Sequence, residues 1–275
     1  MRELLKKVIS NFENFIFYRM LKSTMFSSHL NKIFSSGYFN SIKKPKVKEI
    51  RKKSKVLILC PHPDDETIAM GGTIIKEKNI GSDLSVIYCT QKENSIRANE
   101  AKKLCFENKI SHKFLGFDDH DIEINPEIIN SIDTYIKKKK PDKIYLPFFF
   151  DDHDDHKRSV ELIYNYFLKN KDSKIEEIWC YQVYGVMPAT HIIDITSEVK
   201  KKEKLINYYK SVGKKRNWSH WILGSNAFQS RFINAGPKKA FAESYLFFEI
   251  EQFLKLCKIY FKNKSVIYNN RRYRD

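Results

Sequence analysis

From Lys55 to about residue 169 the sequence alternates short apolar runs with longer helical patterns, and this alternation constrains the fold more than any other feature. The run KVLILC at 55–60 is typical of a strand buried on both faces of a parallel sheet. The connections are short, which favours a three-layer α/β/α sandwich around a Rossmann-like, mostly parallel sheet. Further strands are predicted over 83–89, 112–117 and 142–150, with helices over 65–78, 95–107, 126–139 and 156–169.

The remaining sequence divides into an N-terminal extension and linker (1–50), a main domain (51–262) and a basic tail (263–275). In the extension, apolar residues from Leu5 to Leu21 recur at helical spacing between basic ones. This pattern allows either a helix packed on the domain or an interfacial helix on anionic lipid. Late in the main domain we predict strands over 175–184 and 190–196 and helices over 197–212 and 239–261.

The chain is strongly basic, with 50 Lys and Arg against 33 Asp and Glu, a formal net charge of +17. Such a charge favours an anionic partner: a membrane surface, a nucleic acid or a phosphorylated substrate. No nucleic-acid-binding motif accompanies it, so we expect no specific nucleic-acid partner. The five cysteines form no CxxC pair, which indicates a reducing compartment without a disulfide framework. No apolar run is long enough to span a bilayer and no signal peptide is recognisable. We therefore expect a cytoplasmic protein, peripheral at the inner membrane face if the extension binds lipid.

The segment PHPDDE (61–66) directly follows the first predicted strand of the alternating region. Ligand sites of parallel sheets lie at the carboxyl ends of the strands. His62 and Asp65 supply an imidazole and a carboxylate, both good zinc ligands, and their spacing lets both point into one space. Asp64 stands between them and can lie beside a metal without binding it. The alternative is structural, because Asp64 and Asp65 also suit the start of a helix.

A second cluster, DDHDDHKR (151–158), follows the strand predicted to end at residue 150. On its own it also fits a solvated acidic loop that starts a helix. Two such clusters at equivalent positions in a basic chain favour convergence on a shared site. His62, Asp65 and His156 together would form a two-histidine, one-carboxylate site with room for water, the design of a catalytic zinc site.

The two boxes together resemble the PIG-L or LmbE-like deacetylases, whose hallmarks are a (P/A)HPDDE box and a later HxDH box. The resemblance extends over about residues 54–250. It includes the turn at Thr90, Arg97 with Glu100, LGFDD at 115–119 and AESYLFF at 242–248.

The resemblance implies a role for each matching residue. His62, Asp65 and His156 would bind one zinc ion per chain, and Asp64 would act as the general base. His153 would polarise the carbonyl or donate a proton, and Asp155 would orient an imidazole. Arg97 would contact the substrate; the alternative is a surface ion pair with Glu93 or Glu100.

The segment NWSHWILGSNAF (217–228) is too aromatic for an ordinary loop. Trp218 and Trp221 could line a sugar pocket, or they could belong to a satellite hydrophobic cluster.

These features predict a zinc-dependent hydrolase that removes an N-acetyl group from an amino sugar of the N-acetylglucosamine type. The sugar would be carried on a lipid, a nucleotide or a small molecule, with a phosphate-bearing carrier favoured by the basic charge. Another metal-dependent amidase or a two-metal phosphodiesterase is the alternative enzyme. A nucleic-acid-binding module is the least favoured alternative.

Overall fold

The computed structural model describes residues 28, 32, 44–185, 187–214 and 216–274. The chain divides into two units, Ile42–Leu254 and a second unit of Met1–Ser41 with Lys255–Asp275. In its described part the second unit holds the end of α9 (Ile250–Tyr260), then α10 (Lys264–Ile267) and the 3-10 turn η3 (Arg271–Tyr273). The helix predicted from Leu5 to Leu21 lies outside the described residues.

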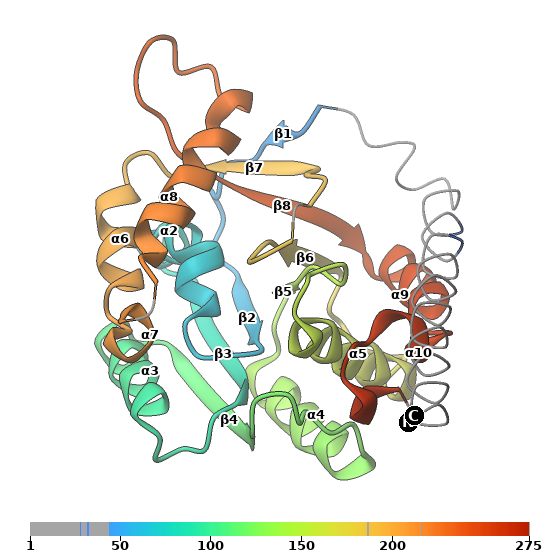
Figure 1. Ribbon diagram of the computed structural model, residues 1–275. Coiled ribbons are helices and arrows are strands. Elements are labelled where there is room, and N and C mark those ends of the chain that lie inside the picture. Colours follow the sequence, from blue (N-terminus) through green and yellow to red (C-terminus); the bar gives the residue numbers. More distant parts are fainter. Residues whose placement is uncertain (1–27, 29–31, 33–43, 186, 215, 275) are drawn as a thin grey trace, which may run out of the picture. The chain divides into compact units, whose positions relative to one another are not determined.

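In the described part of the larger unit, eight strands form one sheet in the order β1-β7-β8-β6-β5-β2-β3-β4 (Figure 1). Strand β8 runs antiparallel to β6 and β7, and the other neighbouring pairs are parallel. The strands are β1 (Lys46–Val47), β2 (Lys55–Cys60), β3 (Asp83–Thr90), β4 (Ser111–Phe117), β5 (Lys143–Pro147), β6 (Glu177–Tyr181), β7 (His191–Asp194) and β8 (Ala242–Glu249).

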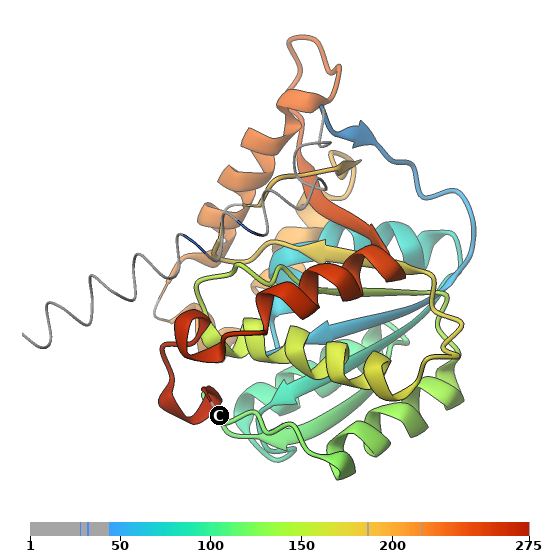
Figure 2. The ribbon, with the colours of Figure 1, turned by 90° about the vertical axis from the view of Figure 1, so that its right-hand side faces the viewer.

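Helices cover both faces of this sheet, which confirms the predicted α/β class (Figures 1 and 2). Helices α2 (Asp65–Asn79) and α3 (Ile96–Glu107) lie on one face, and α4 (Pro126–Lys139) and α5 (Asp154–Lys169) lie on the other. Helices α6 (Val199–Ile206) and α8 (Trp218–Gln229) pack against α2, with the short α7 (Lys210–Gly213) beside α3 and η2 (Ser230–Phe232) after α8. None of the helices in the described residues combines the length and the apolar character needed to cross a bilayer.

Strand β2 is central to the core, and its continuous apolar sequence reflects burial on both faces. Val56, Ile58 and Cys60 belong to one buried cluster with Ile68 and Met70 of α2. The intervening Leu57 and Leu59 are also fully buried. Because successive side chains of a strand point to opposite faces, every side chain of a strand covered on both sides is buried, and apolar residues are favoured at each position.

Three late segments differ from the sequence-based prediction. The helix predicted over 239–261 is wrong in its first half, because residues Ala242–Glu249 form strand β8 and only Ile250–Tyr260 form a helix. A continuous apolar run carries no periodicity that separates a buried strand from a buried helix. The helix predicted over 197–212 is interrupted between α6 and α7, and the helix over Trp218–Gln229 was not predicted.

Strand β8 also explains a break in α2. Met70 has non-helical angles (φ −137°, ψ 22°), so the second half of α2 begins with free N–H groups. The Glu243 carboxylate accepts those of Gly72 and Thr73 at 2.8 and 2.7 Å. It also pairs with the fully buried Lys202 ammonium at 2.7 Å. This buried network holds β8, α6 and α2 together, and α2 begins at the acidic segment Asp64–Glu66.

We predict that Glu243→Ala destabilises the protein by about 3–5 kcal/mol, because it leaves a buried ammonium and two backbone donors without their acceptor. The measurement is the free energy of unfolding in urea. Lys137→Ala, which removes an exposed ion pair with Asp133, is the control and should change it little. Equal losses in the two variants would contradict the role given to Glu243.

Candidate metal centre and active site

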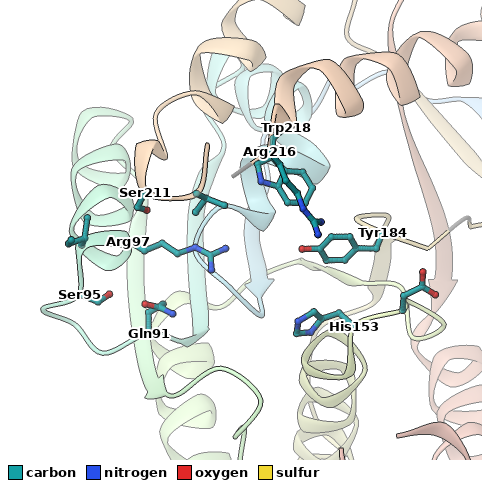
Figure 3. Close-up of a pocket in the computed structure, with 11 residues that line it drawn as sticks. Gln91, Ser95, Arg97, His153, Tyr184, Ser211, Arg216 and Trp218 are labelled. Atoms are coloured by element: carbon teal, nitrogen blue, oxygen red, sulfur yellow. The ribbon is translucent and has the colours of Figure 1, made fainter. Parts of the chain in front are cut away.

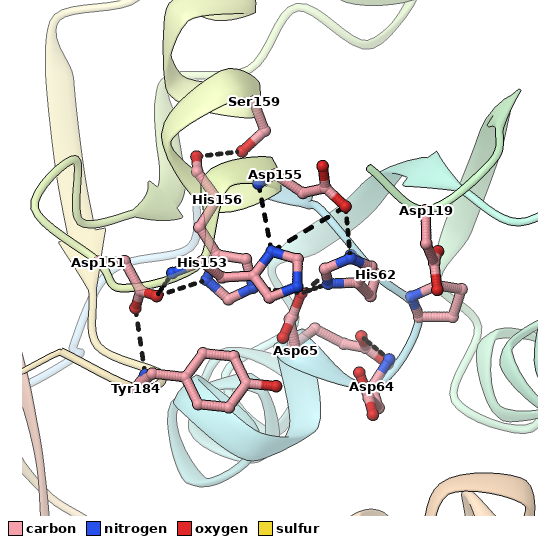
Figure 4. A network of polar contacts seen from close by, with 12 residues as sticks. His62, Asp64, Asp65, Asp119, Asp151, His153, Asp155, His156, Ser159 and Tyr184 are labelled. Carbon is pink, nitrogen blue, oxygen red and sulfur yellow. Dashed lines mark hydrogen bonds and ion pairs between the residues drawn. The ribbon is translucent and has the colours of Figure 1, made fainter. Parts of the chain in front are cut away.

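The two acidic, histidine-containing segments meet where the strand order reverses. Strands β2 and β5 are parallel neighbours, and the chain continues from β2 to β3 on one side and from β5 to β6 on the other. A crevice for ligands forms outside the carboxyl ends of strands at such a switch point. His62 follows β2, while His153 and His156 follow β5, and Figure 4 shows the three imidazoles side by side.

Three buried side chains share the geometry of a metal-ligand set. Asp65 Oδ2 lies 3.4 Å from His62 Nδ1 and 3.5 Å from His156 Nε2. Ligand atoms placed tetrahedrally around an ion at zinc–nitrogen and zinc–oxygen distances are about 3.3–3.5 Å apart. The structure therefore brings together the three residues predicted to bind the metal.

Each imidazole of this set has a carboxylate at its other ring nitrogen (Figure 4). His62 Nε2 lies 3.1 Å from Asp155 Oδ2, and His156 Nδ1 lies 3.3 Å from Asp151 Oδ1. Both carboxylates are fixed by backbone donors: Asp155 accepts the N–H of His120, and Asp151 accepts that of Tyr184. Metal-binding histidines almost always have such a partner, which sets the tautomer and the ring orientation.

The charges and the hydrogen bonding fit a cation. His156 Nδ1 faces the Asp151 carboxylate at 3.3 Å, and its buried Nε2, 3.5 Å from Asp65, makes no hydrogen bond among the described residues, so the Nε2 lone pair is available to a cation. Burial lowers the pKa of His62, but Asp155 and Asp65 outweigh it and raise this pKa to about 10. Burial raises the pKa of Asp65, but the neighbouring imidazoles of His156 and His62 keep it below its usual value. A bound cation would supply the positive charge that the proton on His62 otherwise supplies.

A second possible ligand group consists of His62, His153 and Asp155. It is less suitable, because His153 Nδ1 already accepts the backbone N–H of Asp155 at 3.2 Å and Asp155 Oδ2 accepts the N–H of His120. Both groups use His62, and a neutral imidazole has a single nitrogen with a free lone pair. The groups are therefore alternative positions for one ion.

Asp64 has a strained backbone, with φ of 122°, where residues other than glycine are uncommon. Glu66 Oε2 accepts its N–H at 3.1 Å, and Arg97 pairs with its carboxylate. Burial raises the pKa of Asp64 to about 6, against the opposing charge of Arg97. A carboxylate with a pKa in this range suits a general base near neutral pH, and strain of this kind concentrates at functional sites.

Arg97 makes contacts that the sequence did not indicate. Its guanidinium binds the Asp64 carboxylate and the Pro63 carbonyl. The expected alternative pairs are otherwise engaged, since Glu100 accepts from Ser211 and Glu93 pairs with Lys102. Arg97 thus holds the predicted base and also lines the cavity described next.

A cavity of about 780 Å³ opens beside the candidate ligands (Figure 3). Arg97 and His153 face it from opposite sides, with Tyr184, Arg216 and Trp218 around the rest. The Trp218 ring also belongs to the buried core cluster, so this aromatic segment both packs and lines a pocket.

The family model of the GlcNAc-PI de-N-acetylases, PIG-L, matches residues 57–167 of this chain. Over this segment the chain is similar to the PIG-L family. Diacetylchitobiose deacetylase of Thermococcus kodakarensis is 30% identical over 122 residues, which are 38% of this chain and 46% of that protein. The match thus spans about half the length of this curated relative.

Solved structures resemble the chain over a longer range. The N,N'-diacetylchitobiose deacetylase of Pyrococcus horikoshii has a TM-score of 0.61 at 19% identity, covering 81% of this chain and 92% of that one. GalB, the 4-carboxy-2-hydroxymuconate hydratase of Pseudomonas putida KT2440, has a TM-score of 0.59 at 15% identity, covering 71% of this chain and 96% of the other. At these identities the likeness establishes the fold.

Three residues that lie near the candidate metal ligands are not identified by the sequence analysis. Asp151 is the first residue of the second cluster, DDHDDHKR (151–158), but nothing in the sequence distinguishes it from the neighbouring, exposed Asp152. His120 and Tyr184 lie on loops far from both boxes, and their rings stack on or beside His153. Loop residues positioned only by the tertiary fold give no periodic signal.

We predict that Asp151→Asn weakens metal binding about 10–100-fold, because it removes the charged partner that orients His156. Zinc affinity measured by competition with a chromophoric chelator provides the test. Asp172→Asn, on an exposed loop after α5, is the matched control and should leave the affinity unchanged. An unaltered affinity in Asp151→Asn would show that Asp151 does not support a metal ligand.

Proposed function

We propose that this chain is a metal-dependent N-deacetylase that hydrolyses the acetamide of an amino sugar of the N-acetylglucosamine type. The observation that carries the proposal is the buried group of His62, Asp65 and His156, each imidazole backed by its own carboxylate, beside a cavity. The similarity to diacetylchitobiose deacetylases and to the GlcNAc-PI de-N-acetylases points to the same reaction class.

Zinc is the metal that we propose, at one ion per chain. Two imidazoles and one carboxylate with an open fourth position are the usual ligands of catalytic zinc. The same ligand types also hold ferrous iron in facial triads, so the identity of the metal is to be measured directly. When bound, such an ion acts as a Lewis acid and makes a water molecule acidic enough to lose a proton near neutral pH.

Asp64 is the proposed general base. It adjoins the ligand Asp65, and Arg97 fixes the direction of its carboxylate. In the hydrolysis, Asp64 accepts a proton from the attacking water as the new carbon–oxygen bond forms. It then gives this proton to the amide nitrogen as the carbon–nitrogen bond breaks, which leaves acetate and the free amine.

His153 is the proposed donor to the developing oxyanion. Its Nδ1 accepts the N–H of Asp155, so the ring proton of the neutral imidazole lies on Nε2 and can be donated. Burial and the neighbouring His62 and His156 lower the pKa of His153 to about 4, so the ring is neutral near pH 7. Of the two expected roles, polarising the carbonyl therefore fits better than giving up a proton. Loss of one such donor typically costs about 10²–10³ in rate.

The cavity can accommodate the sugar and the first part of its carrier. Aromatic rings such as Trp218 and Tyr184 offer apolar faces to a pyranose, while Arg216 offers a charge to a phosphate of the carrier. A phosphate-bearing lipid or nucleotide carrier is consistent with the net charge of +17.

The test is release of free amine and acetate from a panel of N-acetylglucosamine conjugates, with and without a chelator. We predict that Asp64→Asn lowers turnover by at least about 10²-fold while metal content is kept, because the proton acceptor is lost and the three metal ligands remain. His62→Ala should lose both metal and activity. Asp172→Asn serves again as control. Full activity in chelator, or in Asp64→Asn, would refute the proposed mechanism.

A second measurement separates the one-metal hydrolase from the two-metal alternative. We predict one metal ion per chain by elemental analysis of the active protein, because both possible ligand groups require His62. Two ions per chain, with loss of activity when one is removed, would favour a two-metal phosphodiesterase.

A further inference from the structure

Helix α8 presents two large aromatic side chains to the surface of its unit. Trp221 is 53% exposed and Phe228 is 64% exposed, although Trp218 and Ile222 of the same helix are buried. Residues seven positions apart lie on one helical face, so the two rings form an outward row with the small Gly224 and Ser225 between them. Exposed apolar rows of this kind mark an interaction surface.

All charged residues in the sequence around α8 are basic. Between Glu203 and Glu243 no Asp or Glu occurs, which is unusual in a chain with 33 acidic residues. Eight Lys and Arg lie in this stretch: Lys204, Lys210, Lys214, Lys215, Arg216, Arg231, Lys238 and Lys239. The segment therefore complements a negatively charged surface.

Arginine and aromatic side chains are paired at both ends of the helix. The Arg216 guanidinium lies 5.5 Å from the centre of the Trp221 ring, and that of Arg231 lies 3.9 Å from the centre of the Phe228 ring. Among the described residues, neither arginine makes an ion pair with a carboxylate. At a bilayer surface the rings can enter the acyl boundary while the guanidinium groups remain at the phosphates.

The Trp221 end of this row lies beside the cavity. Arg216 and Trp218 line the cavity itself, and Trp218 and Trp221 line a smaller pocket of about 240 Å³ that shares Tyr184 with it. A surface bound to α8 would thus lie next to the opening through which a substrate enters.

We propose that the α8 face, defined by Arg216, Trp221, Phe228 and Arg231, docks on an anionic lipid bilayer. The exposed row of rings favours a bilayer, because the acyl boundary can take up both rings at once, whereas a double-helical nucleic acid presents phosphates and no apolar layer. This docking is independent of the reaction proposed for the cavity and is measured without any turnover.

Tryptophan emission tests the proposal on the full chain. The three tryptophans are Trp179, Trp218 and Trp221, and only Trp221 is exposed. With vesicles of phosphatidylcholine and phosphatidylglycerol, we expect a blue shift and quenching by acyl-brominated lipid. Both responses should be absent with phosphatidylcholine alone. In Trp221→Phe, vesicle binding should persist while most of the quenching is lost.

Paired variants provide the controls. Trp221→Ala with Phe228→Ala should weaken binding in vesicle co-sedimentation by at least about tenfold. Phe106→Ala, which removes an 83% exposed ring from α3, should leave vesicle binding unchanged. Residues 1–43 contain no tryptophan, so vesicle binding without quenching would assign binding to that extension and overturn the proposal. Equal responses with and without phosphatidylglycerol, or a response to RNA alone, would also overturn it.

Discussion

Strands β2 and β5 lie side by side in parallel, and the connections that leave them diverge to opposite sides of the sheet. This arrangement brings His62, Asp65 and His156, which are up to 94 positions apart in the chain, into one buried space. No local sequence rule could place them there, because each segment alone can serve as a helix start or an acidic loop. The site therefore depends on the topology of the sheet, and the rest of the structure maintains that topology.

The convergence of so many acidic side chains is electrostatically costly. Asp64, Asp65, Asp151 and Asp155 are all buried, and a buried carboxylate is destabilising unless a positive charge or several donors compensate it. Arg97 compensates Asp64, and backbone N–H groups compensate Asp151 and Asp155. Asp65 has the imidazoles and one backbone N–H of His62, which leaves it as the natural ligand for a cation. The buried carboxylates thus lower the stability of the fold while they create a pocket suited to a cation, as is common at functional sites.

The sequence predicts those parts of the fold and of the candidate metal site that depend on local sequence patterns. The first strands and helices, up to α5, agree with the structure within a few residues, because buried strands and capped helices have characteristic spacing. Strand β8 does not follow the predicted helix, since its apolar run YLFF (245–248) has no distinguishing periodicity and its neighbours β6 and β7 are distant in sequence. The partners Asp151, His120 and Tyr184 and the Arg97–Asp64 pair were missed for the same reason: they are set by tertiary packing. The predicted ligands, by contrast, lie in two short boxes whose residue types are informative in combination.

X-ray absorption spectroscopy on the metal-loaded protein, combined with anomalous diffraction at the metal edge, tests the central claim most directly. We predict one ion with two imidazole nitrogens and one carboxylate oxygen at about 2.0–2.2 Å, located between His62, Asp65 and His156. An ion bound instead by His153 and Asp155, or anomalous signal absent from the space between His62 and His156, would contradict the account.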